Sequence, residues 1–315
     1  MKLEETKNVG VVGAGLMGHG IAQVFGSKGY RVNLFDKDQG MLESAPNRIR
    51  KNLQVFLEMK LTKESDVEQC LQNINLCYDM SAVCSGADIM IEAVIENLEV
   101  KKSVFAEMER LTSQQTILCS NTSGISIGRI SEGLQFRDRV IGTHFWNPPH
   151  VVPCVEVIKS EFTSEEVFHT IVDLMKELGK EPVRVLKDIL GFLGNRLQLA
   201  LFREALSLVE KGIAAPEDID RVVKYSFGSR LPFIGPFETA DLAGIDLGYE
   251  VYKYLVPDLS IDSRPSNVLK TMIDDGLLGV KTGKGFYRWS DEKIKDVTNR
   301  RDSGLLELIK IRSKL

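Results

Sequence analysis

Two side chains near the middle of the chain are of the types that perform general acid–base catalysis. His144 follows the apolar residues 140–143, which predict a strand, and it is one of only four histidines in the sequence. Open α/β sheets bind ligands where their strands end, so this position suits a residue that acts on a substrate. The sequence therefore points to His144 as a base that takes a proton from a hydroxyl group.

Glu156 is the expected partner of His144. It lies in the apolar run 153–158 with β-branched residues on both sides, where an unpaired carboxylate is costly. A pair with Glu156 would hold the imidazole in one tautomer and stabilise its protonated form. The alternative is an edge strand on which Glu156 faces solvent.

The other histidines and the cysteines carry no comparable signal. We interpret His19, His150 and His169 as surface or internally satisfied residues, and His144 with His150 lacks a third metal ligand at a fixed spacing. The five cysteines are odd in number and form no C-x-x-C pair, which disfavours a disulfide framework and a zinc site. We expect reduced, mostly buried thiols and no metal.

A glycine motif near the N-terminus predicts a phosphate-binding turn. The valine-rich segment 7–12 predicts a strand, and helical periodicity follows up to Gly29. The G-x-G-x-x-G motif between them consists of Gly13, Ala14, Gly15, Leu16, Met17 and Gly18. Gly13 permits the tight turn, Gly15 lets the backbone approach a pyrophosphate, and Gly18 allows close packing of helix and strand. An ordinary glycine-rich turn is the alternative interpretation.

Asp36 strengthens the dinucleotide interpretation. It ends the next apolar run, 32–35, at about the twenty-residue distance where dinucleotide-binding folds place the acid that accepts hydrogen bonds from a ribose. A carboxylate there would repel a 2′-phosphate. The expected cofactor is therefore NAD rather than NADP.

The positions of the predicted elements indicate an α/β domain followed by a helical one. Residues 38–72 read as two helices, and strands are expected at 74–76, 88–92, 116–119, 140–143, 155–158 and 182–186, with helices at 98–111 and 165–178. This alternation predicts a doubly wound, mainly parallel sheet. No convincing strand follows residue 189. We expect domains at 1–187 and 188–289, then a tail at 290–315 with a short helix near 305–309.

Composition excludes several classes of protein. Forty basic and forty-four acidic residues give a formal net charge of −4, so no cationic face suggests nucleic-acid binding. No apolar stretch is long enough to span a membrane, and the polar start at residues 1–5 has no hydrophobic signal core behind it. We expect a cytoplasmic protein.

Taken together, the motifs resemble the 3-hydroxyacyl-CoA dehydrogenase family over nearly the whole chain. The matching segments are 13–18, 91–97 with Lys101, 120–123, 144–148, 155–157, 191–192 with 195–197, 235–238 and 281–287. The resemblance implies a Rossmann-type domain followed by an all-α domain that carries the dimer interface. It also implies a homodimer and NAD-dependent oxidation of the C3 hydroxyl of a 3-hydroxyacyl-CoA.

The resemblance also implies roles for individual residues. His144 would be the base and Glu156 its charge partner, while Ser123 and Asn195 would hold the reacting oxygen and the substrate. Asn147 would lie near the nicotinamide and the substrate carbonyl. Glu96 and Lys101 match positions that contact the nicotinamide half of the cofactor, and Lys281 matches a lysine that the helical domain brings to it. Taken singly, these side chains also fit purely structural roles, such as helix caps or solvent-exposed ion pairs.

The substrate is less determined than the chemistry. Residues 42–60, where acyl-CoA members bind CoA, do not match the family's serine and lysine; the basic residues Arg48, Arg50, Lys51 and Lys60 would suit either CoA phosphates or a solvated helix face. Residues 147–153, 195–198, 208–213 and 233–239 resemble the lambda-crystallin (L-gulonate 3-dehydrogenase) branch, whose members act on free hydroxy acids. The proline of the family's Asp-x-Pro-Gly-Phe is Leu190 here. A non-catalytic NAD(H)-binding dimer is the rival from another class.

Overall fold

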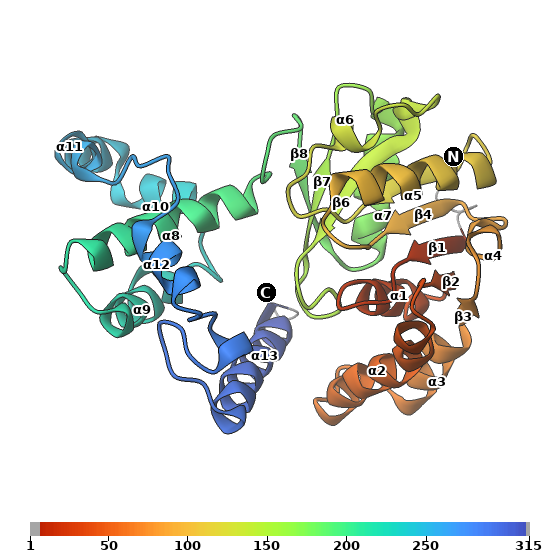
Figure 1. Ribbon diagram of the computed structural model, residues 1–315, viewed down its shortest axis with the longest axis horizontal. Coiled ribbons are helices and arrows are strands. Elements are labelled where there is room, and N and C mark those ends of the chain that lie inside the picture. The colour runs from red at the N-terminus through yellow and green to blue at the C-terminus, as the bar shows by residue number, and fades with distance from the viewer. Residues whose placement is uncertain (1–6, 313–315) are drawn as a thin grey trace. The chain divides into compact units, whose positions relative to one another are not determined.

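The computed structural model describes residues 7–312, which form two compact units, one up to Asn195 and one from Arg196 onward (Figure 1). The polar N-terminal residues 1–5 considered above lie outside the described range. The strands of the first unit are β1 (Asn8–Val12), β2 (Arg31–Phe35), β3 (Ile74–Cys77), β4 (Ile89–Glu92), β5 (Ile117–Ser120), β6 (Val140–Phe145), β7 (Cys154–Ile158) and β8 (Glu181–Val185). Its helices are α1 (Gly18–Gly26), α2 (Gln39–Glu58), α3 (Glu64–Gln72), α4 (Met80–Cys84), α5 (Leu98–Leu111), α6 (Ile127–Ile130) and α7 (Glu165–Glu177).

All eight strands form one sheet, in the order β3-β2-β1-β4-β5-β6-β7-β8. Every neighbouring pair is parallel except β6 and β7, which are antiparallel. Strand order reverses direction at β1, which lies between β2 and β4, and ligands bind at such a switch point beyond the carboxyl ends of the strands. The expected doubly wound, mainly parallel sheet is confirmed.

Helices cover both faces of this sheet. On one face, apolar residues of α1, α2, α3 and α7 form a continuous core with the sheet, with Phe25, Leu42 and Ile171 completely buried. On the other face, α4, α5 and α6 pack over residues such as Met90 and Leu118. The central strands β4 and β5 are buried at every position, as expected for strands covered on both sides.

Two short helices were not expected from the sequence. Asp79 and Ser126 cap α4 and α6, since their side chains accept hydrogen bonds from the N–H groups of Ala82 and Arg129. Periodicity cannot reveal helices of one turn, so only these capping residues could have signalled them.

The second unit is helical in its described part. Its elements are α8 (Gly194–Glu210), which begins at the end of the first unit, α9 (Pro216–Tyr225), α10 (Pro236–Ala243), α11 (Ile245–Leu255), α12 (Asn267–Asp274) and α13 (Asp291–Arg312). Besides short 3-10 turns, only isolated bridges at Gly279, Lys284 and Arg288 interrupt the helices. The expected all-α domain is therefore confirmed. Helix α13 is much longer than the short helix expected near residues 305–309. The shorter helix was expected because residues 291–304 are mostly polar and charged and show no clear apolar periodicity.

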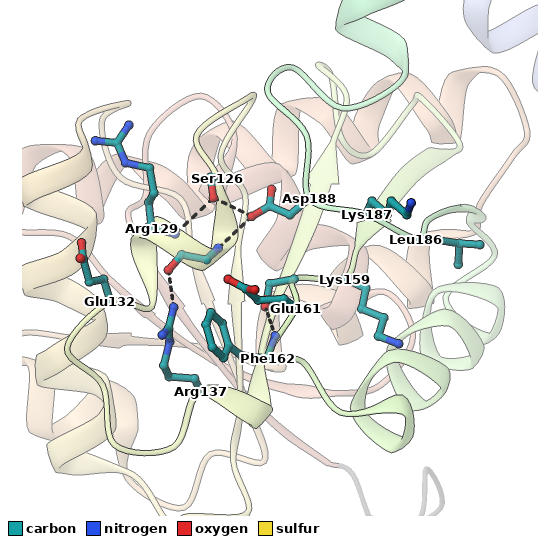
Figure 2. A pocket seen from close by; sticks show the side chains of 12 residues that line it. Ser126, Arg129, Glu132, Arg137, Lys159, Glu161, Phe162, Leu186, Lys187 and Asp188 are labelled. Atoms are coloured by element: carbon teal, nitrogen blue, oxygen red, sulfur yellow. Dashed lines mark hydrogen bonds between the residues drawn. The ribbon is translucent and has the colours of Figure 1, made fainter.

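The segment that leads from β8 to α8 packs against the first unit. Phe192 is completely buried in the core beneath α5 and α6, and the Asp188 carboxylate accepts hydrogen bonds from the Ser126 hydroxyl (2.7 Å) and the Gly128 N–H (2.9 Å). Figure 2 shows these two bonds beside a cavity of about 810 Å³, lined by α6 and by residues 159–162 and 186–188. Residues 188–195 thus belong structurally with the sheet.

Candidate active site

The glycine motif forms a tight turn between β1 and α1. Gly13 has a φ of +105°, and a Cβ atom there would lie 2.5 Å from the Ala93 carbonyl oxygen. A Cβ at Gly18 would lie 1.7 Å from the Gly13 carbonyl oxygen, so helix and turn meet at backbone distance. A Cβ at Gly15 would meet no atom within 4 Å. The turn is therefore closed on the protein side and open at Gly15, as a pyrophosphate would require.

Asp36 closes the same turn from the end of β2. One of its carboxylate oxygens accepts a hydrogen bond from the Ala14 N–H (2.7 Å), and the other accepts one from the Asp38 N–H (2.9 Å). Each oxygen retains a further lone pair. Asp36 can therefore hold the turn and still accept hydrogen bonds from ribose hydroxyls.

Arg48 supports the glycine turn from α2, a role that sequence reasoning missed. Its guanidinium donates to the carbonyl oxygens of Ala14 (2.7 Å), Gly15 (3.3 Å) and Met41 (2.8 Å). The neighbouring His19 is buried, with its Nδ1 atom 2.7 Å from the Gly15 carbonyl oxygen. Arg48 is thus neither a solvated side chain nor free for a CoA phosphate.

His144 lies at the centre of a second cluster, inside β6. The expected strand ended at Thr143, but antiparallel pairing of His144 with Glu156 and of Phe145 with Val155 extends β6 past the histidine. The His144 Nδ1 atom lies 2.8 Å from a Glu156 carboxylate oxygen, and both side chains are buried. The rings of Trp146 and Phe192 pack at 5.1 and 5.8 Å from the imidazole.

Glu156 lies on β7, an internal strand, so the edge-strand alternative is excluded. Its second carboxylate oxygen accepts hydrogen bonds from the N–H groups of Leu193 (2.9 Å) and Gly194 (3.0 Å), at the start of α8. Burial opposes ionisation, but the hydrogen bonds from His144, Gly194 and Leu193 hold the pKa of Glu156 below its ordinary value. An ionised Glu156 requires the proton on His144 Nδ1 and leaves Nε2 as the basic nitrogen.

The depressed pKa of Glu156 also has a consequence for stability. A carboxyl whose folded-state pKa is lowered stabilises the fold fully at pH values above its unfolded-state pKa, and this contribution is lost as the pH falls through the folded-state value. The arrangement of Glu156 with His144 and α8 therefore persists throughout the neutral range.

Ser123 and Asn195 meet beside this pair. The Asn195 side-chain amide donates to the Ser123 carbonyl oxygen at 2.6 Å, and the Ser123 side chain is exposed. Asn195 directly follows Gly194, which Glu156 binds, and a Cβ at Gly194 would lie 2.3 Å from the Trp146 ring. Residues 193–195 thus bring three predicted site residues, Glu156, Ser123 and Asn195, to one place with His144.

Glu96 and Lys101 form a network with a carboxylate that sequence reasoning did not single out. The Lys101 ammonium is buried and contacts Glu92 at 2.7 Å and Glu96 at 3.2 Å. Glu92 ends β4 and also accepts from the Ser120 hydroxyl at 2.7 Å. An acid at the end of the apolar run 89–91 was the available signal, as it was for Glu156.

Glu96 connects this network to Ser123. Its carboxylate accepts from the Thr122 hydroxyl (2.6 Å) and the Ser123 N–H (2.9 Å). Burial opposes ionisation, but the Thr122 hydroxyl and the Lys101 ammonium hold the pKa of Glu96 below its ordinary value. Glu96 is therefore an anion that fixes the backbone at Ser123, while Lys101 lies behind it.

The last two predicted residues are less constrained. Asn147 is exposed in the segment after β6, next to the cis Asn147–Pro148 peptide bond. Lys281 is exposed in the 3-10 turn Val280–Thr282 of the second unit. Their roles remain predictions.

The exposed His169 and the mostly buried thiols agree with expectation. His169 is exposed on α7, and four of the five cysteines are buried, with Cys154 half-buried. Within residues 7–312, no group of three or more His, Cys, Asp or Glu side chains could hold a metal ion. No helix in that range is long and apolar enough to cross a membrane.

Both parts of the chain match established family models. Residues 8–189 match the NAD-binding domain of 3-hydroxyacyl-CoA dehydrogenase, and residues 191–289 match the C-terminal domain of the same enzyme. The chain belongs to the 3-hydroxyacyl-CoA dehydrogenase family. The cofactor of this oxidoreductase family is NAD, in agreement with the open glycine turn and Asp36.

Proteins named for different substrates are similar to this chain. Human mitochondrial hydroxyacyl-coenzyme A dehydrogenase is 36% identical over 294 residues, which cover 90% of this chain and 91% of the relative. A 5-formyl-3-hydroxy-2-methylpyridine 4-carboxylate 5-dehydrogenase from Mesorhizobium japonicum is 32% identical over 305 residues, which cover 97% and 98%. A crystal structure of an enzyme of the latter name, described as an NAD⁺-dependent dismutase, matches with a TM-score of 0.91 at 32% identity and the same coverage.

The glycine turn allows a test of cofactor binding that spares the fold. Because a side chain at Gly15 meets no protein atom, we expect Gly15→Val to leave the melting temperature unchanged and to weaken NADH binding at least about tenfold, or about 1.4 kcal/mol. Fluorescence titration with NADH measures this. Gly304→Ala on α13, where a Cβ also meets nothing within 4 Å, serves as the control. Unchanged NADH affinity in Gly15→Val would place the pyrophosphate elsewhere.

Proposed function

We propose that this protein oxidises a secondary alcohol to a ketone, and catalyses the reverse reaction, with His144 as the general base and acid. The observation that carries the proposal is the buried His144–Glu156 pair, whose carboxylate is anchored on the start of α8. His144 Nε2 takes the hydroxyl proton, and Glu156 stabilises the resulting imidazolium. Bound NAD supplies the hydride acceptor. A protein that only bound NAD(H) would have no use for such a base.

The other site residues would position the reactants. Ser123 and Asn195 would hold the reacting oxygen and the substrate, which agrees with their contact beside Glu156. Asn147 would lie at the nicotinamide end. Glu96 would serve the nicotinamide half of the cofactor, with Lys101 holding Glu96 in place from the protein interior. Lys281 would be contributed by the second unit.

As the substrate we propose a 3-hydroxyacyl-CoA. Support comes from relatives that are named hydroxyacyl-CoA dehydrogenases, such as the human one, and that match along nine-tenths of this chain. The location in the cell that we propose is the cytoplasm, although the human relative is named mitochondrial.

A free hydroxy acid is the second candidate substrate, and two observations favour it. The basic residues of α2 are partly engaged: Arg48 holds the glycine turn, and Arg50 pairs with Glu68. A relative named for a formyl pyridine carboxylate, a carboxylate without CoA, also matches 97% of the chain. The contacts of Arg48 and Arg50 do not favour a CoA phosphate site on α2.

Steady-state kinetics with matched substrates separate the two candidates. NADH oxidation is measured with acetoacetyl-CoA, acetoacetate and a panel of free 3-oxo acids, and NAD reduction with aldonates and a formyl pyridine carboxylate. We expect kcat/KM for acetoacetyl-CoA to exceed that for acetoacetate. Turnover of free acids alone would overturn the thioester assignment. Absence of turnover with every compound would overturn the proposed function.

We also propose that the second unit forms a homodimer. In its described part only Leu206 and Leu306 are buried, while large apolar side chains are exposed on α10, α11 and the following segment. The most exposed include Phe237 (86%), Leu242 (80%) and Ile261 (88%). An apolar surface of this kind requires a partner surface in water.

Charge placed on this surface is expected to separate the subunits. Light scattering of the unmodified protein should give twice the 35.2 kDa mass of the chain, and the double variant Phe237→Asp, Leu242→Asp should give the single mass at micromolar concentration. Lys295→Asp, a charge reversal at an exposed position of the charge-rich α13, is the control and should remain dimeric. A monomeric unmodified protein would contradict the proposal.

A further inference from the structure

We propose that Lys180 is a positioning residue that holds the segment between the two catalytic strands. This inference rests on the proposed function for its catalytic meaning. Residues 146–153 join β6, which carries His144, to β7, which carries Glu156, and they include Asn147. The path of this segment therefore sets the position of Asn147 relative to the His144–Glu156 pair on the two strands that it joins.

Three prolines shape the hydrogen bonding of residues 146–153. Pro148, Pro149 and Pro153 have no N–H group, so the segment has more backbone acceptors than donors. Such a segment needs donors from elsewhere, and a lysine ammonium offers three donors and no acceptor.

Lys180 supplies these donors from the residue that precedes β8. Its ammonium donates to the carbonyl oxygens of Pro149 (2.5 Å) and Val152 (3.1 Å). The next residue, Glu181, donates its N–H to the Pro153 carbonyl oxygen (2.9 Å). The two residues together therefore bind three carbonyl groups of the segment.

The held segment also touches the cofactor helix. A Cβ at Gly20 of α1 would lie 2.6 Å from the Pro149 ring and 3.3 Å from His150 Nδ1. The segment therefore connects α1 to β6 and β7, and Lys180 fixes it at its middle. Loss of these contacts would shift Asn147 relative to His144 and Glu156, whose own spacing is fixed by their pairing in the β6–β7 ladder.

Lys180 is a buried cation whose ammonium faces carbonyl oxygens of the segment. The side chain is buried and makes no ion pair within the described residues, and burial lowers its pKa to about 8. A buried ammonium without a carboxylate costs folding free energy. Stability alone therefore does not explain a lysine here, whereas the carbonyl groups of the segment do.

The test combines kinetics with hydrogen–deuterium exchange on the full-length Lys180→Met variant, with Lys176→Met as the control. Lys176 is exposed on α7 and pairs with Asp173. In Lys180→Met we expect kcat to fall by about 10- to 100-fold, with NADH affinity retained. Exchange should accelerate at the amides of Val151 and Val152, which donate to Pro148, and remain unchanged in β4 and β5. Lys176→Met should match the unmodified protein in every measurement.

A second variant keeps the proposal testable if Lys180→Met folds poorly. In Lys180→Ala, added n-propylammonium should restore slow exchange at residues 151–152 and part of kcat, whereas n-propanol should not. Unchanged exchange there in both variants, or equal acceleration throughout the sheet, would overturn the positioning role. If the unmodified protein turns over no substrate, the proposed function fails, and the exchange data still decide whether Lys180 holds the segment.

Discussion

Replacing His144 by glutamine is expected to lower kcat by about 100- to 10,000-fold, the usual contribution of a general acid–base group. Glutamine can still donate to the Glu156 carboxylate, so the packing against Trp146 and Phe192 should survive. It has no basic nitrogen to take the hydroxyl proton. Because His144 does not touch the glycine turn, NADH affinity should stay within about threefold, or about 0.65 kcal/mol.

Another histidine supplies the control for this experiment. His169 is exposed on α7, and His169→Gln should leave kcat and NADH affinity unchanged. Stopped-flow single turnovers, together with NADH titrations, measure both quantities for the two variants. A His144→Gln variant that retains the unmodified kcat would remove His144 from the proton-transfer step.

Replacing Glu156 by glutamine is expected to lower kcat over the same range, about 100- to 10,000-fold, although the side chain keeps its shape. One Glu156 oxygen accepts from Leu193 and Gly194, and the other faces His144. A glutamine must place its oxygen toward the two N–H groups and its NH₂ toward His144 Nδ1. His144 then carries its proton on Nε2, where a base must have none.

Glu181→Gln is the matched control, because Glu181 is an exposed carboxylate on the neighbouring strand β8. In Glu156→Gln, NADH affinity should be nearly unchanged while kcat falls. ¹⁵N chemical shifts of the His144 ring report the tautomer directly. A Glu156→Gln variant with full activity, or with the proton still on Nδ1, would remove this pair from the mechanism.

The elements that position the site could be predicted because their signals are local. The strand, glycine turn and helix at residues 8–26 and the acid at Asp36 lie within one stretch of chain, and their periodicity and spacing show directly. Glu156 was predictable for a different reason. A carboxylate within an apolar strand needs a partner, and His144 on the preceding strand was the partner available.

The rest of the site depends on contacts that spacing does not reveal. Arg48 looks like any basic residue on a helix, yet it binds carbonyl groups of the glycine turn more than thirty residues away. The hydrogen bond from the Leu193 N–H to the Glu156 carboxylate joins β7 to the residue before α8, and the two partners lie 37 residues apart in the sequence. Every residue except proline has a backbone N–H group, so the residue types do not reveal which of these groups a side chain will bind.

The substrate is the part on which sequence and structure give the least direction. If His144 and Glu156 act on the hydroxyl as proposed, the same proton and hydride transfer would serve a thioester or a free acid, so these two residues do not distinguish the substrate classes. Discrimination between a thioester and a free acid lies in the groups that bind the remainder of the substrate. Arg48 donates to the glycine turn and Arg50 pairs with Glu68, so neither of these basic residues of α2 by itself identifies a CoA phosphate site.

Isotope transfer tests the central claim most directly. The purified protein is incubated with NADH that carries deuterium at C4 and with acetoacetyl-CoA or a free 3-oxo acid, and the product is examined by mass spectrometry. We predict deuterium on C3 of the hydroxy product, and its loss in the His144→Gln variant. A protein that binds NADH but transfers no deuterium to any carbonyl compound, or a His144→Gln variant that transfers it at the unmodified rate, would contradict the account.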